Sequence, residues 1–577
     1  MKDPRGTATR RDMSIVLCGQ AGQGVQTVET LLTRILKTAG YHVHATKEYM
    51  SRVRGGANST TIRVSGKRVS ALVDRMDVLV PLNAGAVAHV AERLTPQTVV
   101  VGEREVVADE AIESNRTLAV PFTEIATEIG GKIYSNVVAV GAIAGLLGLD
   151  PDAVVAYVRR YFAKKSEDIV ANNVKAVRAG YDAIGKLDMP AGLRLSFKPS
   201  AKVKDELLLS GAEAVGLGAI AGGCNFVSSY PMSPSTGVLT FLAQHGLEQG
   251  VLAEQAEDEI AAINMAIGAS YAGARALVTT SGGGFALMTE GVSLAGMLEC
   301  PVVIHLAQRP GPATGLPTRT EQADLELALY AGHGEFPRIL FAPGTLEQAF
   351  DLTQKAFNLA DKYQVPAFVL TDEYLMDSYY NVKGFDLSKT KAERHIVKTA
   401  KDYRRYELTK NGISPRGIPG YGSGLVAVDS DEHDEEGHIT EDLDVRVAMV
   451  DKRLAKGEAL RKDIVRPELI GPKDYKKLVI CWGSTYHVVK EALAELGRTD
   501  TAMLHYSQVY PLHPSTADLI GKARKTVVVE GNATGQFRKL IRLHAGVDAD
   551  EGLVKYDGLG FTVEDVVEGL TAIDKGR

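Results

Sequence analysis

Short apolar runs alternate with longer helix-like stretches along almost the whole chain. The short runs have the length and composition of buried strands. This alternation predicts an α/β fold class with several domains and parallel sheets. The expected strands are 14–18, 41–45, 77–82, 97–101, 116–121, 302–306, 339–341, 367–371, 477–482, 502–506 and 526–530. The main expected helices are 25–39, 136–149, 211–221, 260–273 and 345–363.

Breaks in this alternation predict the domain boundaries. A chain of 577 residues is too long for one core, so several domains are expected. A basic connector with prolines and a highly charged stretch with few apolar runs separate three α/β regions. The expected segments are a flexible extension at 1–12, domains at 13–190, 206–385 and 474–577, the connector at 191–205 and the charged stretch at 386–473.

The stretch 260–273 is dense in Ala, Ile, Met and Gly, so a helix there is apolar nearly all round and is expected to be buried. Its first turn and the residues before it contain Glu254, Glu257, Asp258 and Glu259. Carboxylates at this position can simply favour the positive end of the helix dipole. Alternatively, Glu259 enters an apolar pocket, where its pKa would rise and it could share a proton with a ring nitrogen.

Two polar side chains follow predicted strands, at the sheet edge where α/β proteins place ligands. In the motif Tyr-Pro-Met-Ser-Pro-Ser at 230–235, two prolines hold the turn extended and present the Ser233 hydroxyl. The alternative is that Ser233 or Ser235 caps the next helix. Arg309 ends an apolar run and suits bidentate recognition of a carboxylate, unless it forms a surface ion pair.

A glycine-rich turn, with Gly19, Gly22 and Gly24, joins the first predicted strand to the first predicted helix. Such a turn forms a nest of backbone N–H groups suited to a phosphate, although it can also be only a tight connection. A dinucleotide fingerprint would place an acidic residue near the end of the next strand. Here that strand leads to Lys47, Arg52 and Arg54 beside two glycines, which predicts either a second anion-facing loop or a solvated charged turn.

Charge and hydropathy exclude some classes of protein. A net charge of −6 and a pI near 6.2 argue against a nucleic-acid-binding protein, which would carry a basic stripe. No apolar run approaches the ~18 residues of a transmembrane span. Residues 1–12 lack the hydrophobic centre of a secretory signal. We therefore expect a cytoplasmic protein that binds neither nucleic acid nor membrane.

The cysteine pattern excludes an iron–sulfur or zinc site within this chain. The cysteines stand singly among apolar neighbours and are expected to be reduced core residues: Cys18, Cys224, Cys300 and Cys481. Any redox cluster must then come from another chain. His433 and His438 lie among acids, but a solvated loop is favoured over a metal site because the spacing fits no standard site.

Three motifs in order carry a resemblance to a known family. Glu259-x-x-Ala262, followed by small-residue and glycine-rich stretches up to Gly284, resembles the pyrimidine-binding domain of thiamine diphosphate enzymes. The 230–235 motif is similar to Tyr-Pro-Ile-Thr-Pro-Ser, and Arg309 followed by Gly-Leu-Pro-Thr318 resembles a substrate loop. With the N-terminal domain, the chain resembles the α subunit of 2-oxoacid:ferredoxin oxidoreductases with a γ domain fused at its N-terminus.

The resemblance implies a role for each domain and for the central motifs. The domain at 13–190 would be the γ domain, 206–385 the thiamine pyrimidine-binding domain, and 474–577 a transketolase-C-like domain. Glu259 would be the catalytic residue facing the pyrimidine ring, with Tyr230 and Pro231 beside the cofactor. The substrate's carboxylate and 2-oxo groups are expected at Ser233, where the family usually has threonine, and Arg309, with Thr318 nearby.

The same resemblance implies where two further groups bind. The loop after Arg309 looks most like that of the 2-oxoglutarate members, whose distal carboxylate would need a cation such as Arg319 or one from another subunit. Coenzyme A is expected at the N-terminal glycine turn and the basic loop, at Gly19, Gly22, Gly24 and Arg54.

The implied partners are a β subunit, which would hold the thiamine diphosphate tail, Mg²⁺ and a [4Fe–4S] cluster, and ferredoxin. A dimer of α–β pairs, a heterotetramer, is expected. The implied reaction is oxidative decarboxylation of 2-oxoglutarate with coenzyme A to succinyl-CoA, or the reverse carboxylation of a reductive TCA cycle. The alternatives are a pyruvate or branched-chain 2-oxoacid enzyme, a non-catalytic scaffold, and a nicotinamide dehydrogenase, which would rest only on the N-terminal glycines.

Overall fold

The computed structural model describes residues 12–51, 56–108, 112–190 and 192–576. The chain divides into two compact units. The first lies within Met1–Leu209 and also takes Ser378–Gly384, and the second comprises Ser210–Asp377 and Phe385–Arg577. Residues 378–384, which the sequence pattern placed with the second domain, return to the first unit because they pair with one of its strands.

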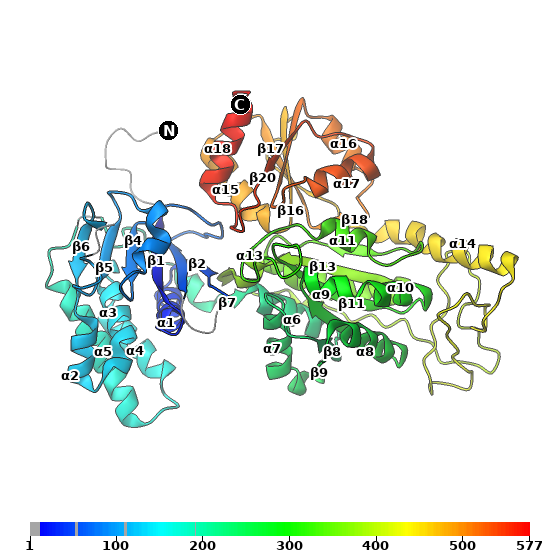
Figure 1. The fold of residues 1–577 in the computed structure, drawn as a ribbon, viewed down its shortest axis with the longest axis horizontal. Helices are drawn as coiled ribbons and strands as arrows, with labels where there is room; N and C mark the ends of the chain where they lie inside the picture. The colour runs from blue at the N-terminus through cyan, green and yellow to red at the C-terminus, as the bar shows by residue number, and fades with distance from the viewer. Residues whose placement is uncertain (1–11, 52–55, 109–111, 191, 577) are drawn as a thin grey trace. The chain divides into compact units, whose positions relative to one another are not determined.

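The first unit contains a mixed sheet, whose eight strands in the described residues follow the order β6-β5-β4-β1-β3-β2-β14-β7 (Figure 1). β1 (Asp12–Gln20) is antiparallel to β3 (Ala57–Ser65) and parallel to β4 (Val78–Pro81). The other strands are β2 (His42–Glu48), β5 (Val99–Gly102), β6 (Arg116–Ala119), β7 (Leu207–Ser210) and β14 (Tyr379–Val382). Asn381 secures β14, because its Oδ1 accepts the Val43 N–H at 2.7 Å.

Small residues let the helices of the first unit pack closely. The helices are α1 (Val25–Thr38), α2 (Phe122–Ile129), α3 (Ser135–Leu147), α4 (Pro151–Tyr161) and α5 (Glu167–Gly185). Where α3 meets α5, a Cβ on Gly141 would overlap the carbonyl of Val177, and one on Gly180 would overlap that of Val138. Glycine therefore permits the backbone contact at this crossing.

The second unit contains a larger sheet whose seven strands, counted over the described residues, follow the order β18-β12-β13-β11-β10-β8-β9. The pairs are parallel except β12–β18. The strands are β8 (Phe226–Ser229), β9 (Leu252–Gln255), β10 (Ala276–Thr280), β11 (Val302–Gln308), β12 (Ile339–Phe341), β13 (Pro366–Asp372) and β18 (Gln508–Tyr510).

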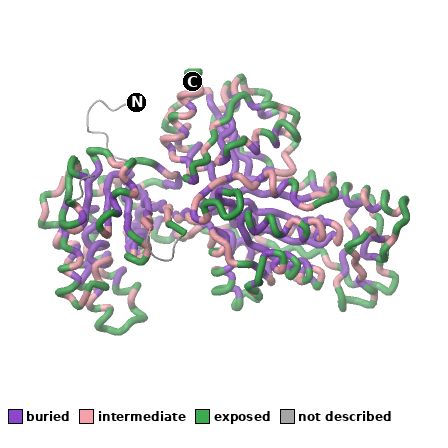
Figure 2. The backbone as a smooth tube through the Cα atoms, viewed as in Figure 1, coloured by how far each residue is buried: buried purple, intermediate pink, exposed green. Residues whose placement is uncertain are grey.

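Helices pack along this sheet, and its central strands are buried (Figures 1 and 2). They are α6 (Gly211–Ala221), α7 (Thr236–His245), α8 (Glu259–Tyr271), α9 (Gly282–Leu287), α10 (Thr289–Met297), α11 (Leu325–Tyr330), α12 (Leu346–Tyr363) and α13 (Glu373–Asp377).

The C-terminal part of the second unit forms a further sheet, of five strands in the described chain, in the order β15-β17-β16-β19-β20. Its strands are β15 (Glu468–Ile470), β16 (Lys477–Trp482), β17 (Thr501–Tyr506), β19 (Lys525–Glu530) and β20 (Glu551–Val554). Its helices are α15 (Tyr486–Leu496), α16 (Thr516–Gly521), α17 (Gln536–Ala545) and α18 (Val563–Asp574). Residues of both sheets, including Ile304 and Trp482, share one hydrophobic core.

The charged stretch has few regular elements but is fastened to the second unit by buried polar contacts. Arg416 pairs with Asp361, and the Arg405 guanidinium donates to the Glu299 carbonyl at 2.7 Å. The stretch ends in α14 (Leu443–Leu460), whose Lys452 and Lys456 both pair with the buried Glu299 carboxylate. Among the described residues, no helix is long and apolar enough to cross a membrane.

Candidate active site

The two adjacent acids at the start of α8, Asp258 and Glu259, have different environments. Asp258 is the N-cap residue, and its carboxylate accepts the Ala261 N–H at 2.7 Å. Asp258 therefore satisfies the helix end, as the first interpretation of this acidic turn requires. Glu259, the next residue, is only 3% exposed. The two interpretations of the turn thus apply to two neighbouring residues.

The Glu259 carboxyl lies in a hollow made by glycine. Its Oε1 atom is buried and has no hydrogen-bond partner. A Cβ on Gly284 would overlap both that oxygen and Thr280 Oγ1, so only glycine leaves room for the carboxyl at this point. Burial raises the pKa of Glu259, Asp258 adds to the rise, and Arg309 opposes it. Burial without a partner for Oε1 is the environment of a carboxyl whose protonated form is favoured relative to the same group in water.

Arg309 follows β11 directly. Its positive charge is close enough to Glu259 to lower the pKa of that carboxyl, although burial raises it. Its Nη1 donates to the Ser233 carbonyl at 2.8 Å, which joins the 230–235 motif to the end of β11. Its Nε is buried without a hydrogen-bond partner. With 9% of its surface exposed, Arg309 is not the surface residue of the alternative interpretation. A desolvated guanidinium with a spare donor is suited to an anionic ligand.

Two further buried polar residues beside the glycine run, Ser281 and Asp324, had no predicted role. The Ser281 hydroxyl and Asp324 Oδ2 are also buried without hydrogen-bond partners. A Cβ on Gly282 would overlap the Asp324 carboxyl, so this acid lies against the glycine cluster that accommodates Glu259. The signal that the sequence offered for this part of the site was the run of three glycines at 282–284, which follows the buried strand β10. Asp324 lies 40 to 42 positions after this glycine run, and no sequence pattern signals a contact over that separation.

The other predicted residues around the motif 230–235 have mixed surroundings. Tyr230 is 40% exposed, Pro231 and Ser233 are half-buried, and Thr318 is buried. The N-cap position of α7 is Ser235, but its hydroxyl donates to the Met232 carbonyl at 2.7 Å and caps no N–H. Helix capping by these serines, the alternative role, is therefore not observed.

Arg319 has a partner inside the second unit. It lowers the pKa of Glu373, although burial raises that pKa well above its usual value. Its Cβ and Cγ also lie close to Gly558 of the C-terminal part. Its role as the cation for a distal carboxylate stays a prediction.

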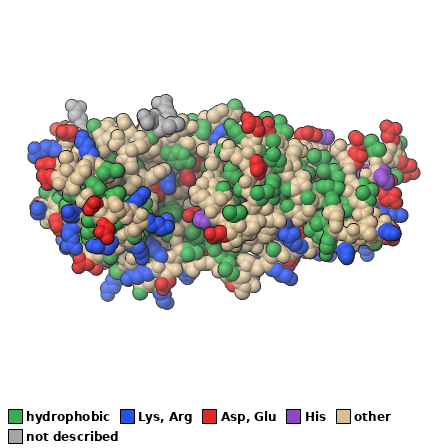
Figure 3. All heavy atoms as spheres, turned by 90° about the horizontal axis from the view of Figure 1, so that it is seen from below, with side chains coloured by type: hydrophobic (Ala, Val, Ile, Leu, Met, Phe, Trp, Pro, Cys, Tyr) green, Lys and Arg blue, Asp and Glu red, His purple; other side chains and the backbone are tan. Residues whose placement is uncertain are grey.

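One expectation for α8 is wrong. The helix is not buried all round, because Ile260 is 51% and Met265 42% exposed. The sheet and α10 cover only the face that includes Ala262, Ile263 and Ala266. Figure 3, seen from below, has apolar side chains among polar ones on the side where α8 and β9 lie in Figure 1. An apolar helix face that its own chain leaves open is typical of a partner surface.

The glycine turn in the first unit joins β1 to α1, as predicted, whereas the phosphate nest stays a prediction because the N–H groups of Gln20, Ala21 and Gln23 have partners within the protein. Gly22 and Gly24 have φ of 89° and 84°, and Gly24 is the N-cap of α1. A Cβ on Gly24 would overlap the Asn136 side chain, whereas Gly19 lies beside Asn83. Lys47 pairs with Glu29 of α1 at 3.3 Å. Arg52 and Arg54 lie outside the described residues.

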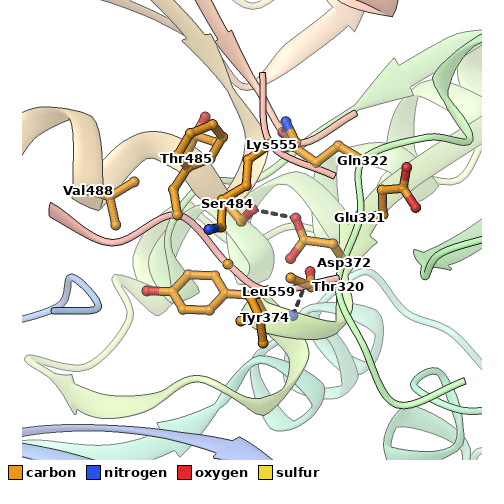
Figure 4. Close-up of a pocket in the computed structure, with 13 residues that line it drawn as sticks. Thr320, Glu321, Gln322, Asp372, Tyr374, Ser484, Thr485, Val488, Lys555 and Leu559 are labelled. Atoms are coloured by element: carbon orange, nitrogen blue, oxygen red, sulfur yellow. Dashed lines mark hydrogen bonds between the residues drawn. The ribbon is translucent and has the colours of Figure 1, made fainter. Parts of the chain in front are cut away.

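A second, small hollow lies where strands of the two sheets in the second unit end (Figure 4). Asp372 at the end of β13 accepts the hydroxyl of Ser484, which follows β16. Gln322 reaches the Trp482 carbonyl at 3.0 Å and receives the Gly531 N–H at 2.8 Å. These hydrogen bonds connect the two sheets. The polar groups here bind one another, whereas Glu259 Oε1 has no partner.

The cysteines agree with the sequence-based prediction, whereas His433 does not. All four cysteines are free and buried, as predicted. His433 is fully buried against Tyr406 and its Nδ1 contacts the Asp431 carbonyl at 3.0 Å, so it is not in a solvated loop. His438 is exposed beside Asp434 and Glu436. The two histidines therefore do not form one metal site.

Thiamine diphosphate fits the residues present. The Glu259 carboxyl, whose buried Oε1 has no hydrogen-bond partner, can bind a protonated or imino nitrogen of an aminopyrimidine, and it lies directly against the backbone of Gly284. When bound, the cofactor supplies an electron sink for decarboxylation.

Matches to known families agree with this site. Residues 217–452 match "Pyruvate flavodoxin/ferredoxin oxidoreductase, thiamine diP-bdg", and residues 14–183 match "Pyruvate ferredoxin/flavodoxin oxidoreductase". The fold and the site thus define an oxidoreductase subunit with a thiamine diphosphate-binding domain.

Relatives of similar length narrow the class. The chain is 33% identical to the 2-oxoacid:ferredoxin oxidoreductase subunit alpha of Sulfolobus sp, over 98% of this chain and 97% of the relative. It is 27% identical to the 2-oxoglutarate oxidoreductase subunit KorA of Mycobacterium tuberculosis, over 98% and 92%. The solved 2-oxoglutarate:ferredoxin oxidoreductase of Magnetococcus marinus matches with a TM-score of 0.91 and 30% identity, covering 97% of this chain and 99% of that one. The chain belongs to the 2-oxoacid:ferredoxin oxidoreductase α subunits, with the γ domain fused at its N-terminus, as the motifs predicted.

Proposed function

We propose that this chain is the fused γ–α subunit of a cytoplasmic 2-oxoglutarate:ferredoxin oxidoreductase and is active only with a β subunit. The reaction is oxidative decarboxylation of 2-oxoglutarate with coenzyme A to succinyl-CoA and CO₂, with electrons passing to ferredoxin, or its reverse. The observation that carries the proposal is the buried, unpartnered Glu259 carboxyl beside Arg309. The relatives named for 2-oxoglutarate support the choice of substrate.

Within this proposal, Glu259 holds a proton at N1′ of the aminopyrimidine, with Tyr230 and Pro231 against the cofactor. Arg309 binds the substrate's 1-carboxylate through its spare Nε donor, with Ser233 and Thr318 close by. Arg319 is assigned to the distal carboxylate.

The β subunit supplies the site for the diphosphate and Mg²⁺, and the [4Fe–4S] cluster. This division agrees with the burial of every cysteine in this chain. Coenzyme A is assigned to the turn at Gly19, Gly22 and Gly24, together with Arg54. The assembly is a dimer of α–β pairs, and the open apolar face of α8 is a surface suited to such contacts.

The test is an assay of the chain purified with its β partner, in which a viologen dye is reduced in the presence of coenzyme A. We expect activity with 2-oxoglutarate to exceed that with pyruvate or branched-chain 2-oxoacids. Glu259→Gln should abolish the activity, whereas Glu257→Gln, an exposed acid in the same turn, should retain it. Activity only with pyruvate would change the substrate, and no activity with any 2-oxoacid would favour a scaffold.

Arg309→Ala tests the anion site in the same assay. Removing a desolvated cation should raise KM for the 2-oxoacid by about 10- to 100-fold, because hydrogen bonds to charged groups contribute about 1.5–3 kcal/mol. An unchanged KM would remove Arg309 from substrate binding.

A further inference from the structure

We propose that Asp324 is a further substrate-binding residue, which in its neutral form donates a hydrogen bond to the carboxylate bound at Arg309 and on ionising weakens substrate binding. This inference rests on the proposed function. It adds to the reaction a pH-dependent control of 2-oxoacid affinity.

The first argument is that the position of Asp324 is held from two sides. Its backbone N–H donates to Gln308 Oε1 at 3.0 Å, and Gln308 itself is anchored through Nε2 to the Thr371 carbonyl at 3.1 Å. Its carboxyl lies against the backbone of Gly282, where a Cβ would overlap both carboxyl oxygens. Gln308 and Arg309 are consecutive at the end of β11, so the same strand positions both the acid and the guanidinium.

The second argument is that the polar groups here are unsatisfied. Asp324 Oδ2 and Arg309 Nε are both buried without hydrogen-bond partners. An unsatisfied buried polar group costs about 1–3 kcal/mol. Asp324 and Arg309 are close enough to shift each other's pKa, and each has one buried polar atom left open. Together they indicate a ligand that carries both an acceptor for Arg309 and an acceptor for a protonated carboxyl. The carboxylate and 2-oxo oxygens of a 2-oxoacid meet both requirements.

The third argument concerns the charges around Asp324. Burial raises its pKa to about 7, Glu321 of the same loop adds to the rise, and Arg309 opposes it. Glu259 on α8 acts on the same guanidinium. Near neutral pH both forms of Asp324 are therefore populated. The neutral acid can donate to an anion, whereas the carboxylate repels it and competes for Arg309.

The experiment measures KM for 2-oxoglutarate with the α–β complex between about pH 6 and about pH 8.5. Above the pKa of Asp324, KM should rise by about tenfold for each pH unit while kcat changes little, because only the neutral acid donates. Asp324→Asn, whose amide remains a neutral donor, should flatten this rise. Asp324→Leu, which has no donor, should have a raised KM at every pH.

Glu326→Gln is the matched control. This acid lies two residues further on, is half-buried, and pairs with Lys539 at 3.2 Å, so its loss should leave the pH profile of KM unchanged. Calorimetric titration of the same complexes with oxamate, an isostere of pyruvate that cannot lose CO₂, provides a readout without turnover. Oxamate affinity should fall with rising pH in the wild type but not in Asp324→Asn.

Two results would overturn the inference: a KM profile for Asp324→Asn that follows the wild type, or oxamate binding by Asp324→Leu that equals the wild type. Either can be observed while the wild-type complex oxidises 2-oxoacids, in which case the proposed function stands without it. A wild-type complex that turns over no 2-oxoacid would instead refute the proposed function.

Discussion

Two buried glutamates of the second unit have opposite environments. Glu299 is 1% exposed, and the Lys452 ammonium binds both its oxygens, at 2.6 and 2.7 Å, with Lys456 as a further partner. Although burial opposes it, the two lysines hold the pKa of Glu299 at about 2. Glu259 is similarly buried, but its Oε1 has no partner and its pKa is raised.

The difference distinguishes a structural charge from a functional one. The paired carboxylate of Glu299 fastens α14 to the end of α10, and every charge there is used within the protein. The Glu259 carboxyl lies against the backbone of Gly284 and its Oε1 has no partner in the protein, so one hydrogen-bonding position stays open, as the proposed cofactor contact requires. Burial alone therefore does not distinguish the two glutamates, whereas the presence or absence of a partner for the carboxyl does.

The largest expected effect comes from breaking the paired region. Glu299→Gln leaves Lys452 and Lys456 buried without a counter-charge, which should lower the free energy of unfolding by about 3–5 kcal/mol. Trp482, the only tryptophan in the chain and part of the shared core, reports this loss by fluorescence during urea denaturation. Glu458→Gln, an exposed acid paired with Arg461, should change little, and an equal loss in both variants would contradict the comparison.

The same carboxylate should make stability depend on acid pH. The pKa of Glu299 falls from 4.5 to about 2 on folding, so its stabilisation is complete above about pH 4.5 and is lost as the pH falls towards 2. In Glu299→Gln this part of the acid dependence should disappear. Urea denaturation of both proteins at pH values across that window measures the difference, and parallel curves would argue against the pairing.

A smaller effect should come from filling the open hollow. Gly284→Ala places a methyl group where Glu259 Oε1 and Thr280 Oγ1 lie, which should destabilise the protein by about 1–3 kcal/mol and reduce activity with 2-oxoglutarate. Gly268→Ala, in the middle of α8 with open space around it, should instead stabilise by about 0.5–1 kcal/mol. Equal effects of the two substitutions on stability and activity would mean that the close contact of Gly284 with Glu259 is required for neither.

The smallest effect expected is an increase in stability. Because the raised pKa of Glu259 means that burial disfavours its ionised form, Glu259→Gln should increase the free energy of unfolding above the unfolded-state pKa, while activity is lost. The same substitution thus has opposite signs at Glu259 and Glu299. Trp482 fluorescence in urea at about pH 7 measures the sign, and a clear loss of stability would mean that Glu259 is structurally paired.

Local features of both units could be read from sequence. The strand and helix alternation, the glycine turn at 19–24 and the acid cap of α8 depend on residues close together in the chain. The motifs at 230–235, 259–284 and 309–318, together with the N-terminal domain, placed the chain in its family. These features could be predicted because hydrophobic period, glycine and capping residues act over a few positions.

Long-range contacts could not be read in this way. β14 returns to the first unit and β18 joins the second unit's larger sheet from far along the chain, and no local pattern signals either pairing. The exposure of Ile260 was missed because composition does not reveal which face of a helix its neighbours cover.

By itself the sequence determined the α/β class, the family and the choice of Glu259 and Arg309 as site residues. Only the tertiary structure decided that Asp258 caps the helix while Glu259 Oε1 keeps no partner, and that Asp324 lies against the same glycine run as Glu259. The physical reason is that a partner, or the lack of one, is a property of the space around a side chain. That space is built by segments whose approach depends on the packing of the whole unit.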